Sequence, residues 1–180
     1  FPIFIAHIVI LLGLSTNLYL QFKIKSLQLK DFYAAIFLFF DLVQLSILLY
    51  LTGGISNPFS ILIIIPSIVS STFLSMGTTF ILGILTVVSL FLLTLFHHPL
   101  PGIHDENISF PKLYLVGYFI AIIVGLIFLS YFGIRFSGES KRRSDAINKL
   151  QQVIAKEYEL ESLGGQAAAA AHSLGTPLAT

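Results

Sequence analysis

Long tracts without any charged side chain set the strongest limit on this sequence. No Asp, Glu, Lys or Arg occurs in residues 1–22, 42–104 or 113–134. Only 11% of all residues are charged, against about a quarter in an ordinary soluble domain. With 56% hydrophobic residues, a soluble fold could not cover its apolar surface. The chain is therefore predicted to be an integral membrane protein, and a soluble or disordered chain is excluded.

The apolar tracts predict an all-α membrane protein. Crossing a bilayer core of roughly 30 Å takes about 20 helical residues. Five stretches meet that length approximately, at residues 2–22, 32–51, 58–76, 78–97 and 113–134. They do not alternate as membrane strands would. We expect a bundle of five transmembrane helices that makes up a domain of residues 1–136.

Lysine and arginine in the short loops predict the orientation of the bundle. The positive residues lie in two places, namely Lys23, Lys25 and Lys30 after the first span, and Arg135, Lys141, Arg142 and Arg143 after the fifth. Cytoplasmic loops carry the excess of such residues. Loop 23–31 and the tail 135–180 are therefore predicted to be cytoplasmic, and loops 52–57 and 98–112 to be exterior.

The composition changes abruptly after the fifth span. Residues 137–165 are charged and carry an apolar stripe, which consists of Ile147, Leu150, Val153, Ile154, Leu160 and Leu163. This pattern predicts a linker that forms a short coiled coil. Residues 166–180 begin a second helical segment, in which an alanine run precedes His172 and Pro177 interrupts the helix.

The segment of residues 53–59, Gly-Gly-Ile-Ser-Asn-Pro-Phe, is the first candidate site. The residue types favour a tight turn, with Asn57 as the N-cap of the next helix and Pro58 in its first turn. The alternative is a ligand site. Free N–H groups at the helix N-terminus would hold a quinone carbonyl, and Phe59 would pack on its ring. The residues alone leave both interpretations open.

Asp41, followed by Gln44, is a possible polar site inside the second span. An unpaired carboxylate at that depth costs roughly 3 kcal/mol or more, so it must be protonated, hydrogen-bonded or at a dimer interface. It either joins helices or acts as a proton-linked sensor. No metal site is expected. The chain has no Cys, and the exterior histidines His97, His98 and His104 do not form an ordered ligand set.

His172 is the remaining candidate. Leu163, Ala167, Ala170 and Leu174 follow the spacing of the buried side of a helix pair. His172 lies about 200° away from that stripe and is expected to face solvent. It is either an ordinary exposed histidine or the phosphate acceptor of a dimerising hairpin, since an exposed imidazole nitrogen is the nucleophile that such a transfer needs.

Two motifs carry a resemblance to a known family. Residues 170–178, Ala-Ala-His-Ser-Leu-Gly-Thr-Pro-Leu, resemble the phosphoacceptor box of a sensor histidine kinase. The Leu-Gly-Thr-Pro-Leu wording is similar to the RegB/PrrB/ActS redox-responsive subfamily. The Gly-Gly-x-x-Asn-Pro-Phe segment independently resembles the quinone-responsive exterior loop of that subfamily.

The resemblance implies the architecture of a membrane sensor. That family has six spans, a linker helix, a dimerisation hairpin and an ATP-binding domain, so we read the chain as a fragment that lacks the first span and the last domain. It implies a multi-pass protein of the bacterial inner membrane whose exterior loops are periplasmic. The implied partners are a second copy of the chain, membrane quinone and a response regulator, with no nucleic acid.

The resemblance also assigns roles to residues. His172 takes the place of the autophosphorylated histidine, and Thr176 that of the residue that assists dephosphorylation of the response regulator. Ser173 replaces the usual acidic residue after the histidine. The family's ubiquinone-sensing positions fall on Gly53, Gly54, Asn57, Pro58 and Phe59. ATP and Mg²⁺ would be bound by the missing downstream domain.

Two other functions stay open from the sequence. Ser173 is no general base at neutral pH, which favours a quinone-binding regulator or pseudokinase without catalysis. A transporter-like membrane protein would need polar or broken spans that line a path, and Asp41 and Pro66 give weak support to that alternative.

Overall fold

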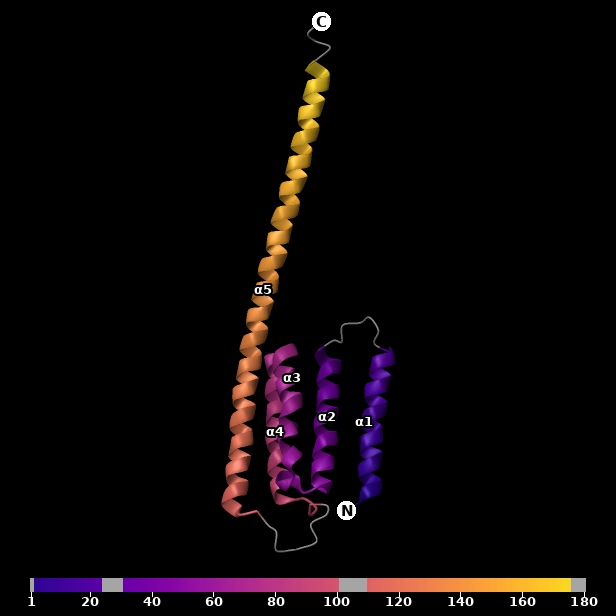
Figure 1. Cartoon of the computed structure of the whole chain (residues 1–180), viewed down its shortest axis with the longest axis vertical. Coiled ribbons are helices and arrows are strands. Elements are labelled where there is room, and N and C mark those ends of the chain that lie inside the picture. Colours follow the sequence, from indigo (N-terminus) through magenta and orange to yellow (C-terminus); the bar gives the residue numbers. More distant parts are fainter. Residues whose placement is uncertain (1, 24–30, 101–109, 176–180) are drawn as a thin grey trace. The chain divides into compact units, whose positions relative to one another are not determined.

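The computed structural model describes residues 2–23, 31–100 and 110–175. Regular structure in these ranges is helical throughout, which confirms the all-α class. The helices are α1 (Ile3–Lys23), α2 (Asp31–Leu51), the 3₁₀ helices η1 (Gly54–Ser56) and η2 (Pro58–Ile64), α3 (Ile65–Phe73), α4 (Met76–Leu95) and α5 (Lys112–Gly175) (Figure 1).

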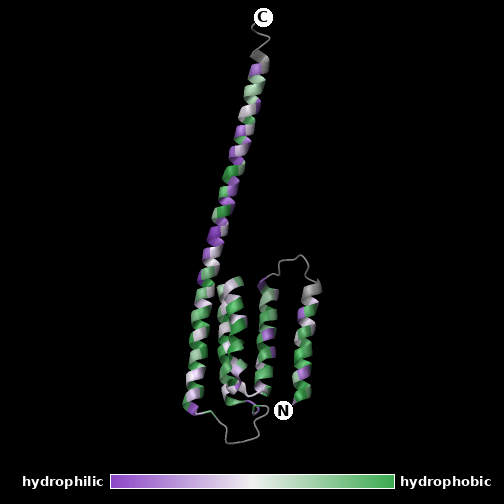
Figure 2. Ribbon diagram, in the orientation of Figure 1, coloured by the Kyte–Doolittle hydropathy of each residue, from purple (hydrophilic) through white to green (hydrophobic). Residues whose placement is uncertain are grey.

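The chain divides into two units, Phe1–Ser137 and Gly138–Thr180. In the first unit, successive helices run in alternating directions beside one another, and the part of α5 before Gly138 is the last of them (Figure 1). Figure 2 shows that this unit is mostly hydrophobic, whereas hydrophilic residues are frequent in the second.

The first unit places apolar side chains outside and hydroxyl groups inside. Phe4 is 77% exposed and Leu113 is 84% exposed, whereas Ser67 is fully buried and Thr86 is 1% exposed. Such an apolar surface is unfavourable in contact with water and is suited to contact with lipid. Serine and threonine are common between membrane helices because they are small and can bond across the interface.

Three helices are long and apolar enough to cross a membrane, as far as the described residues show. They are Asp31–Leu51, Met76–Leu95 and the apolar part of Lys112–His172. Two further apolar helical stretches, Ile3–Tyr19 and Pro58–Phe73, are shorter. The bundle of five spans therefore stays a prediction.

The third apolar segment differs from the helix expected at 58–76. It begins at Pro58 with seven residues of 3₁₀ helix and continues as the nine-residue α3, which ends at Phe73. The backbone of Leu74 is extended, and Ser75 then caps α4 by accepting a hydrogen bond from the Thr78 N–H. A 3₁₀ helix rises about 2.0 Å per residue and an α-helix about 1.5 Å, so the sixteen residues reach about 27 Å.

Hydroxyl pairs join α3 to α4. Ser67 Oγ lies 2.8 Å from Thr86 Oγ1, and Ser70 Oγ lies 3.1 Å from Thr79 Oγ1. Both pairs are buried, and bonds of this kind contribute about 0.6 kcal/mol each between membrane helices. Beside them lies an apolar core formed by Leu42, Leu49, Ile55, Ile63, Ile64, Leu90, Leu93, Ile122 and Leu126.

A glycine brings α5 against α3. Gly133 is buried, and a Cβ placed there would overlap the hydroxyl of Ser71. Small residues allow helix backbones to approach in this way. Gly125, two turns earlier on the same helix, has no atom within 4 Å of the place that a Cβ would take.

The described part of the second unit, residues 138–175, is helical. All the side chains described in residues 138–172 are exposed, including Leu150 at 60% and Leu160 at 62%. Arg143 and Glu139 form an ion pair at 3.3 Å, one turn apart. The predicted coiled coil needs a second helix against this stripe, and it stays a prediction.

The two glycines of α5 give a matched test of the packing. We expect Gly133→Ala to lower the free energy of unfolding by about 1–3 kcal/mol, because the new methyl group meets Ser71. Gly125→Ala should leave it unchanged or raise it by up to about 1 kcal/mol, since alanine favours a helix. Unfolding in mixed micelles of rising SDS content, followed by circular dichroism, measures both, and equal effects of the two changes would contradict this packing.

Candidate functional site

Two glycines turn the chain between α2 and η2. The φ angles of Gly53 and Gly54 are +106° and +54°, in the left-handed region that favours glycine. The positions are also tight. A Cβ on Gly54 would meet the carbonyl oxygen of Leu93 and the side chain of His97, at the end of α4. Both conformation and space therefore require glycine at Gly54.

Asn57 holds this turn together through its side chain. Its Oδ1 accepts a hydrogen bond of 2.9 Å from the Phe59 N–H, which confirms the expected N-cap, although the capped helix is 3₁₀. Its Nδ2 donates to the backbone oxygen of Thr52 at 2.9 Å and to Thr52 Oγ1 at 2.7 Å. The amide thus ties the end of α2 to the start of η2.

The backbone N–H groups at the start of η2 are already in use. Ser56 N–H donates to Gly53 O at 3.0 Å, and Asn57 N–H donates to Gly54 O at 3.2 Å. Ser60 N–H donates to Asn57 O at 2.9 Å. With Phe59 N–H capped and Pro58 lacking an N–H, the helix start does not present the free donors that the ligand interpretation assumed there.

Ile55 and Ser60 are buried and fix the turn to its neighbours, whereas the ring of Phe59 is exposed. Ile55 is 1% exposed, and Ser60 Oγ donates to its carbonyl oxygen at 3.3 Å. Ser60 Oγ also lies 3.1 Å from the hydroxyl oxygen of Tyr118 on α5. The ring of Phe59 is 65% exposed. The turn is therefore fixed to its neighbours, whereas Phe59 is available to a ligand.

The segment that follows α4 contacts the end of α2. His98 N–H donates to Tyr50 O at 2.8 Å, and the two rings meet edge to face with centroids 5.2 Å apart. His97 Nδ1 lies 3.1 Å from the His98 carbonyl oxygen. His104 lies outside the described residues. The residue pair Tyr50 and His98 joins two segments that are far apart in the sequence.

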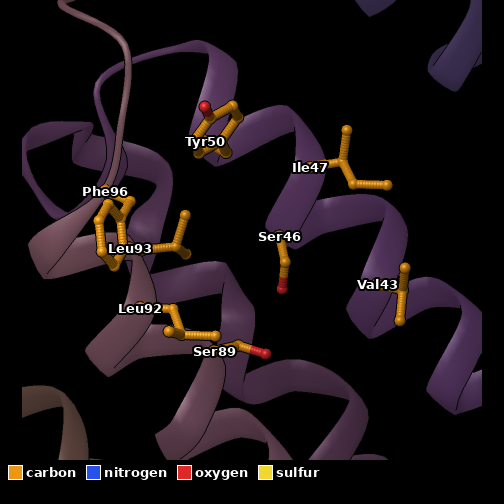
Figure 3. A pocket seen from close by; sticks show the side chains of 8 residues that line it. All are labelled: Val43, Ser46, Ile47, Tyr50, Ser89, Leu92, Leu93 and Phe96. Atoms are coloured by element: carbon orange, nitrogen blue, oxygen red, sulfur yellow. The ribbon is translucent and has the colours of Figure 1, made fainter.

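A cavity of about 360 Å³ lies between α2 and α4, next to this end of the bundle (Figure 3). It is lined by Val43, Ser46, Ile47, Tyr50, Ser89, Leu92, Leu93 and Phe96. Sequence reasoning missed it because each helix reads as an ordinary apolar span. A signal was present in Ser46 and Ser89, which are hydroxyl residues within those spans.

Asp41 and Gln44 do not bond to each other. Gln44 Nε2 donates to Val9 O of α1 at 3.2 Å, and its amide group packs on Gly13. Gln44 therefore joins α1 to α2, as polar residues between membrane helices commonly do. Asp41 is half-buried and has no hydrogen-bond or ion-pair partner within the described part of the chain.

The residues that resemble a phosphoacceptor box, 170–178, belong to the second unit. His172 is exposed in the last turn of α5, and Ser173 follows in the same turn. Thr176 and Pro177 lie outside the described residues. The exposure of His172 agrees with its expected direction, but all the described side chains nearby are exposed as well.

Two curated proteins match the sequence, and both are named Sensor histidine kinase RegB, from Cereibacter sphaeroides. One is 42% identical over 153 residues, which are 85% of this chain and 33% of RegB. The other, from a named strain of that species, is 42% identical over 85 residues, which are 47% of this chain and 18% of RegB. No family model matches the chain. No solved structure matches it.

This similarity defines the class of the chain, which is that of the membrane-associated sensor histidine kinases. Within that class the chain belongs with the RegB type, as the two sequence motifs predicted. It spans about a third of the length of the RegB sequence that it matches over 153 residues.

The cap at Asn57 can be tested by stability. Asn57→Ala removes three hydrogen bonds in the half-buried turn and should lower the free energy of unfolding by about 1–3 kcal/mol. Thr52→Val removes the hydroxyl that accepts from Asn57 Nδ2 and donates to Leu48 O, and it should have a smaller effect because the other two Asn57 bonds remain. Thermal unfolding in detergent, followed by circular dichroism, measures both. The geometry of the turn would be contradicted if Asn57→Ala were as stable as the unaltered protein.

Proposed function

We propose that this chain is the membrane-embedded and linker part of a sensor histidine kinase of a two-component system in the bacterial inner membrane. The observation that carries the proposal is the 42% identity to RegB over 85% of the chain. The first unit supports it, because its exposed apolar and buried hydroxyl side chains suit a lipid environment. The exposed polar helix of the second unit suits a cytoplasmic linker.

In this proposal, His172 is the phosphoryl acceptor. A ring nitrogen of His172 attacks the γ-phosphorus of ATP, whose Mg²⁺ complex is bound by a further domain, and ADP leaves. The phosphoryl group then passes to a carboxylate of the response regulator, and Thr176 assists its later hydrolysis. The exposed position of His172 near the end of α5 supports this role, because a separate domain can reach it.

The proposed input is the redox state of membrane quinone, with ubiquinone as the ligand sensed at residues 53–59. The supporting features are the motif itself and the exposed ring of Phe59. The turn also contacts two other helices, through Gly54 against the end of α4 and Ser60 against Tyr118 of α5. A ligand that shifts this turn would therefore change contacts with the helix that continues toward His172.

The protein is proposed to act as a homodimer. The apolar stripe that includes Leu150 and Leu160 is exposed in a single chain, and pairing with the same stripe of a second copy would bury it. The dimerisation hairpin that is predicted to begin at residues 166–180 would come next in the chain after this pair of linker helices.

A second function is favoured by one residue. Ser173 stands where the family has an acidic residue, and a hydroxyl cannot accept a proton at neutral pH. A regulator that binds quinone and acts through dimer contacts alone, without phosphoryl transfer, would tolerate this serine.

One labelling experiment separates the two functions. The full-length protein in membrane vesicles is incubated with γ-³²P-labelled ATP and Mg²⁺, and acid-labile, base-stable label is measured. The kinase proposal predicts such label on the unaltered protein and its complete loss in His172→Gln. Ser173→Glu, which restores the acidic residue, should label several-fold faster if proton acceptance limits the rate.

The result that would overturn kinase function is an unaltered protein that never acquires label, although it binds ATP. In that case the non-catalytic regulator would be the better account. Label that persists in His172→Gln would instead show that another residue is the acceptor.

A further inference from the structure

Positive charge is concentrated at the start of the second unit. Residues 138–150 carry four basic and two acidic side chains, whereas residues 151–165 carry one basic and three acidic side chains. Hydrophilic residues are frequent throughout this unit (Figure 2). Three of the basic residues, Lys141, Arg142 and Arg143, are consecutive, and all three are exposed on the helix. The net charge of the linker therefore changes from positive to negative along its length.

One of these three positive charges has a partner within the chain. Arg143 Nε lies 3.3 Å from Glu139 Oε1, one turn earlier on the helix. Lys141 and Arg142 form no ion pair with any residue that the structure describes, although Asp145 lies within about one turn of both. Lys141 and Arg142 thus remain available to an anionic partner outside the chain.

The three side chains point in different directions, because an α-helix turns by about 100° per residue. Arg143 lies in line with the apolar stripe, since Ile147 and Leu150 follow it by four and seven residues. Arg142 lies about 100° from Arg143 around the helix, and Lys141 about 160°. The paired arginine is therefore on the side where a second copy of the linker would pack, and the two unpaired cations point away from that side.

The length of chain keeps Lys141 close to the membrane unit. That unit ends at Ser137, and Lys141 follows four residues later. A residue extends the chain by at most about 3.6 Å, so the two Cα atoms lie within about 14 Å in any conformation. The head-group layer of a bilayer is about 6 Å thick on each side. The field of a charged surface extends about 10 Å further at 0.1 M salt. Lys141 is therefore within electrostatic reach of the cytoplasmic head groups.

We infer that Lys141 and Arg142 bind the phosphate groups of anionic phospholipids in the cytoplasmic leaflet. Charge complementarity selects this partner, because that leaflet is negatively charged and each lysine or arginine near it strengthens binding about fivefold. A layer of head groups surrounds an emerging helix and can meet both side chains, although they point in different directions. The acidic residues of 151–165 would be repelled by the same surface, so the attraction is confined to the start of the linker.

This contact would fix the depth at which the linker leaves the membrane. It rests on the membrane location in the proposed function, and it requires neither quinone binding nor phosphoryl transfer.

Lipid selectivity tests the inference. The full-length protein is reconstituted in phosphatidylcholine vesicles with a trace of spin-labelled phosphatidylglycerol or spin-labelled phosphatidylcholine. Electron paramagnetic resonance then measures the fraction of each labelled lipid that is held at the protein. At low salt, the unaltered protein should bind phosphatidylglycerol about three- to tenfold better than phosphatidylcholine. The double variant Lys141→Gln/Arg142→Gln should lower that ratio about threefold or more. About 1 M salt should lower it in the unaltered protein, because salt screens the attraction.

A matched control removes two positive charges from exposed positions farther along the same helix. Lys149→Gln/Lys156→Gln should leave the ratio within about twofold of that of the unaltered protein, because both residues are farther from the membrane unit along the chain. Equal ratios in the two double variants, or no preference for phosphatidylglycerol in the unaltered protein, would overturn the inference. It would also be overturned if Lys141→Gln/Arg142→Gln kept its lipid selectivity and bound the response regulator more weakly, which would assign these residues to a protein partner. Labelling of His172 is measured separately, so the proposed function can stand where this inference fails.

Discussion

Close approach of helices through small and hydroxyl-bearing residues is the condition on which the membrane unit depends. Apolar side chains gain nothing by leaving lipid for a protein interior, so burial of Leu and Phe cannot by itself assemble these helices. The structure instead buries Ser67 against Thr86, seats Gly133 against Ser71, and packs Gln44 on Gly13. Each of these contacts fixes one pair of helices, and together they leave the large apolar residues on the outside.

The same kind of contact builds the candidate site. Gly54 can approach the carbonyl oxygen of Leu93 because it has no side chain, and this brings the turn after α2 to the end of α4. Asn57 then satisfies polar groups that the turn would otherwise leave without a partner. The apolar cavity with Ser89 in its wall lies directly beside this junction. Turn and cavity are thus two parts of one local structure.

Features with a local physical cause could be predicted from the sequence. The charge-free tracts gave the all-α membrane class, and the Asn57-Pro58 pair gave the cap. Features that depend on a partner far along the chain could not. The 3₁₀ course of η2, the bond from Gln44 to Val9 and the cavity between Ser46 and Ser89 each require knowing which helices are neighbours. The resemblance of residues 170–178 to a phosphoacceptor box indicated the family, and the match to RegB confirmed that family.

Under the proposed function, the redox state of membrane quinone controls phosphorylation of His172. The most direct measurement is the initial rate of that phosphorylation in the full-length protein, reconstituted in vesicles whose ubiquinone is held either oxidised or reduced. Control by quinone predicts rates that differ between the two states at equal protein and ATP, and a difference that disappears when ubiquinone is omitted. Equal rates in oxidised and reduced vesicles, with His172 labelled in both, would contradict it.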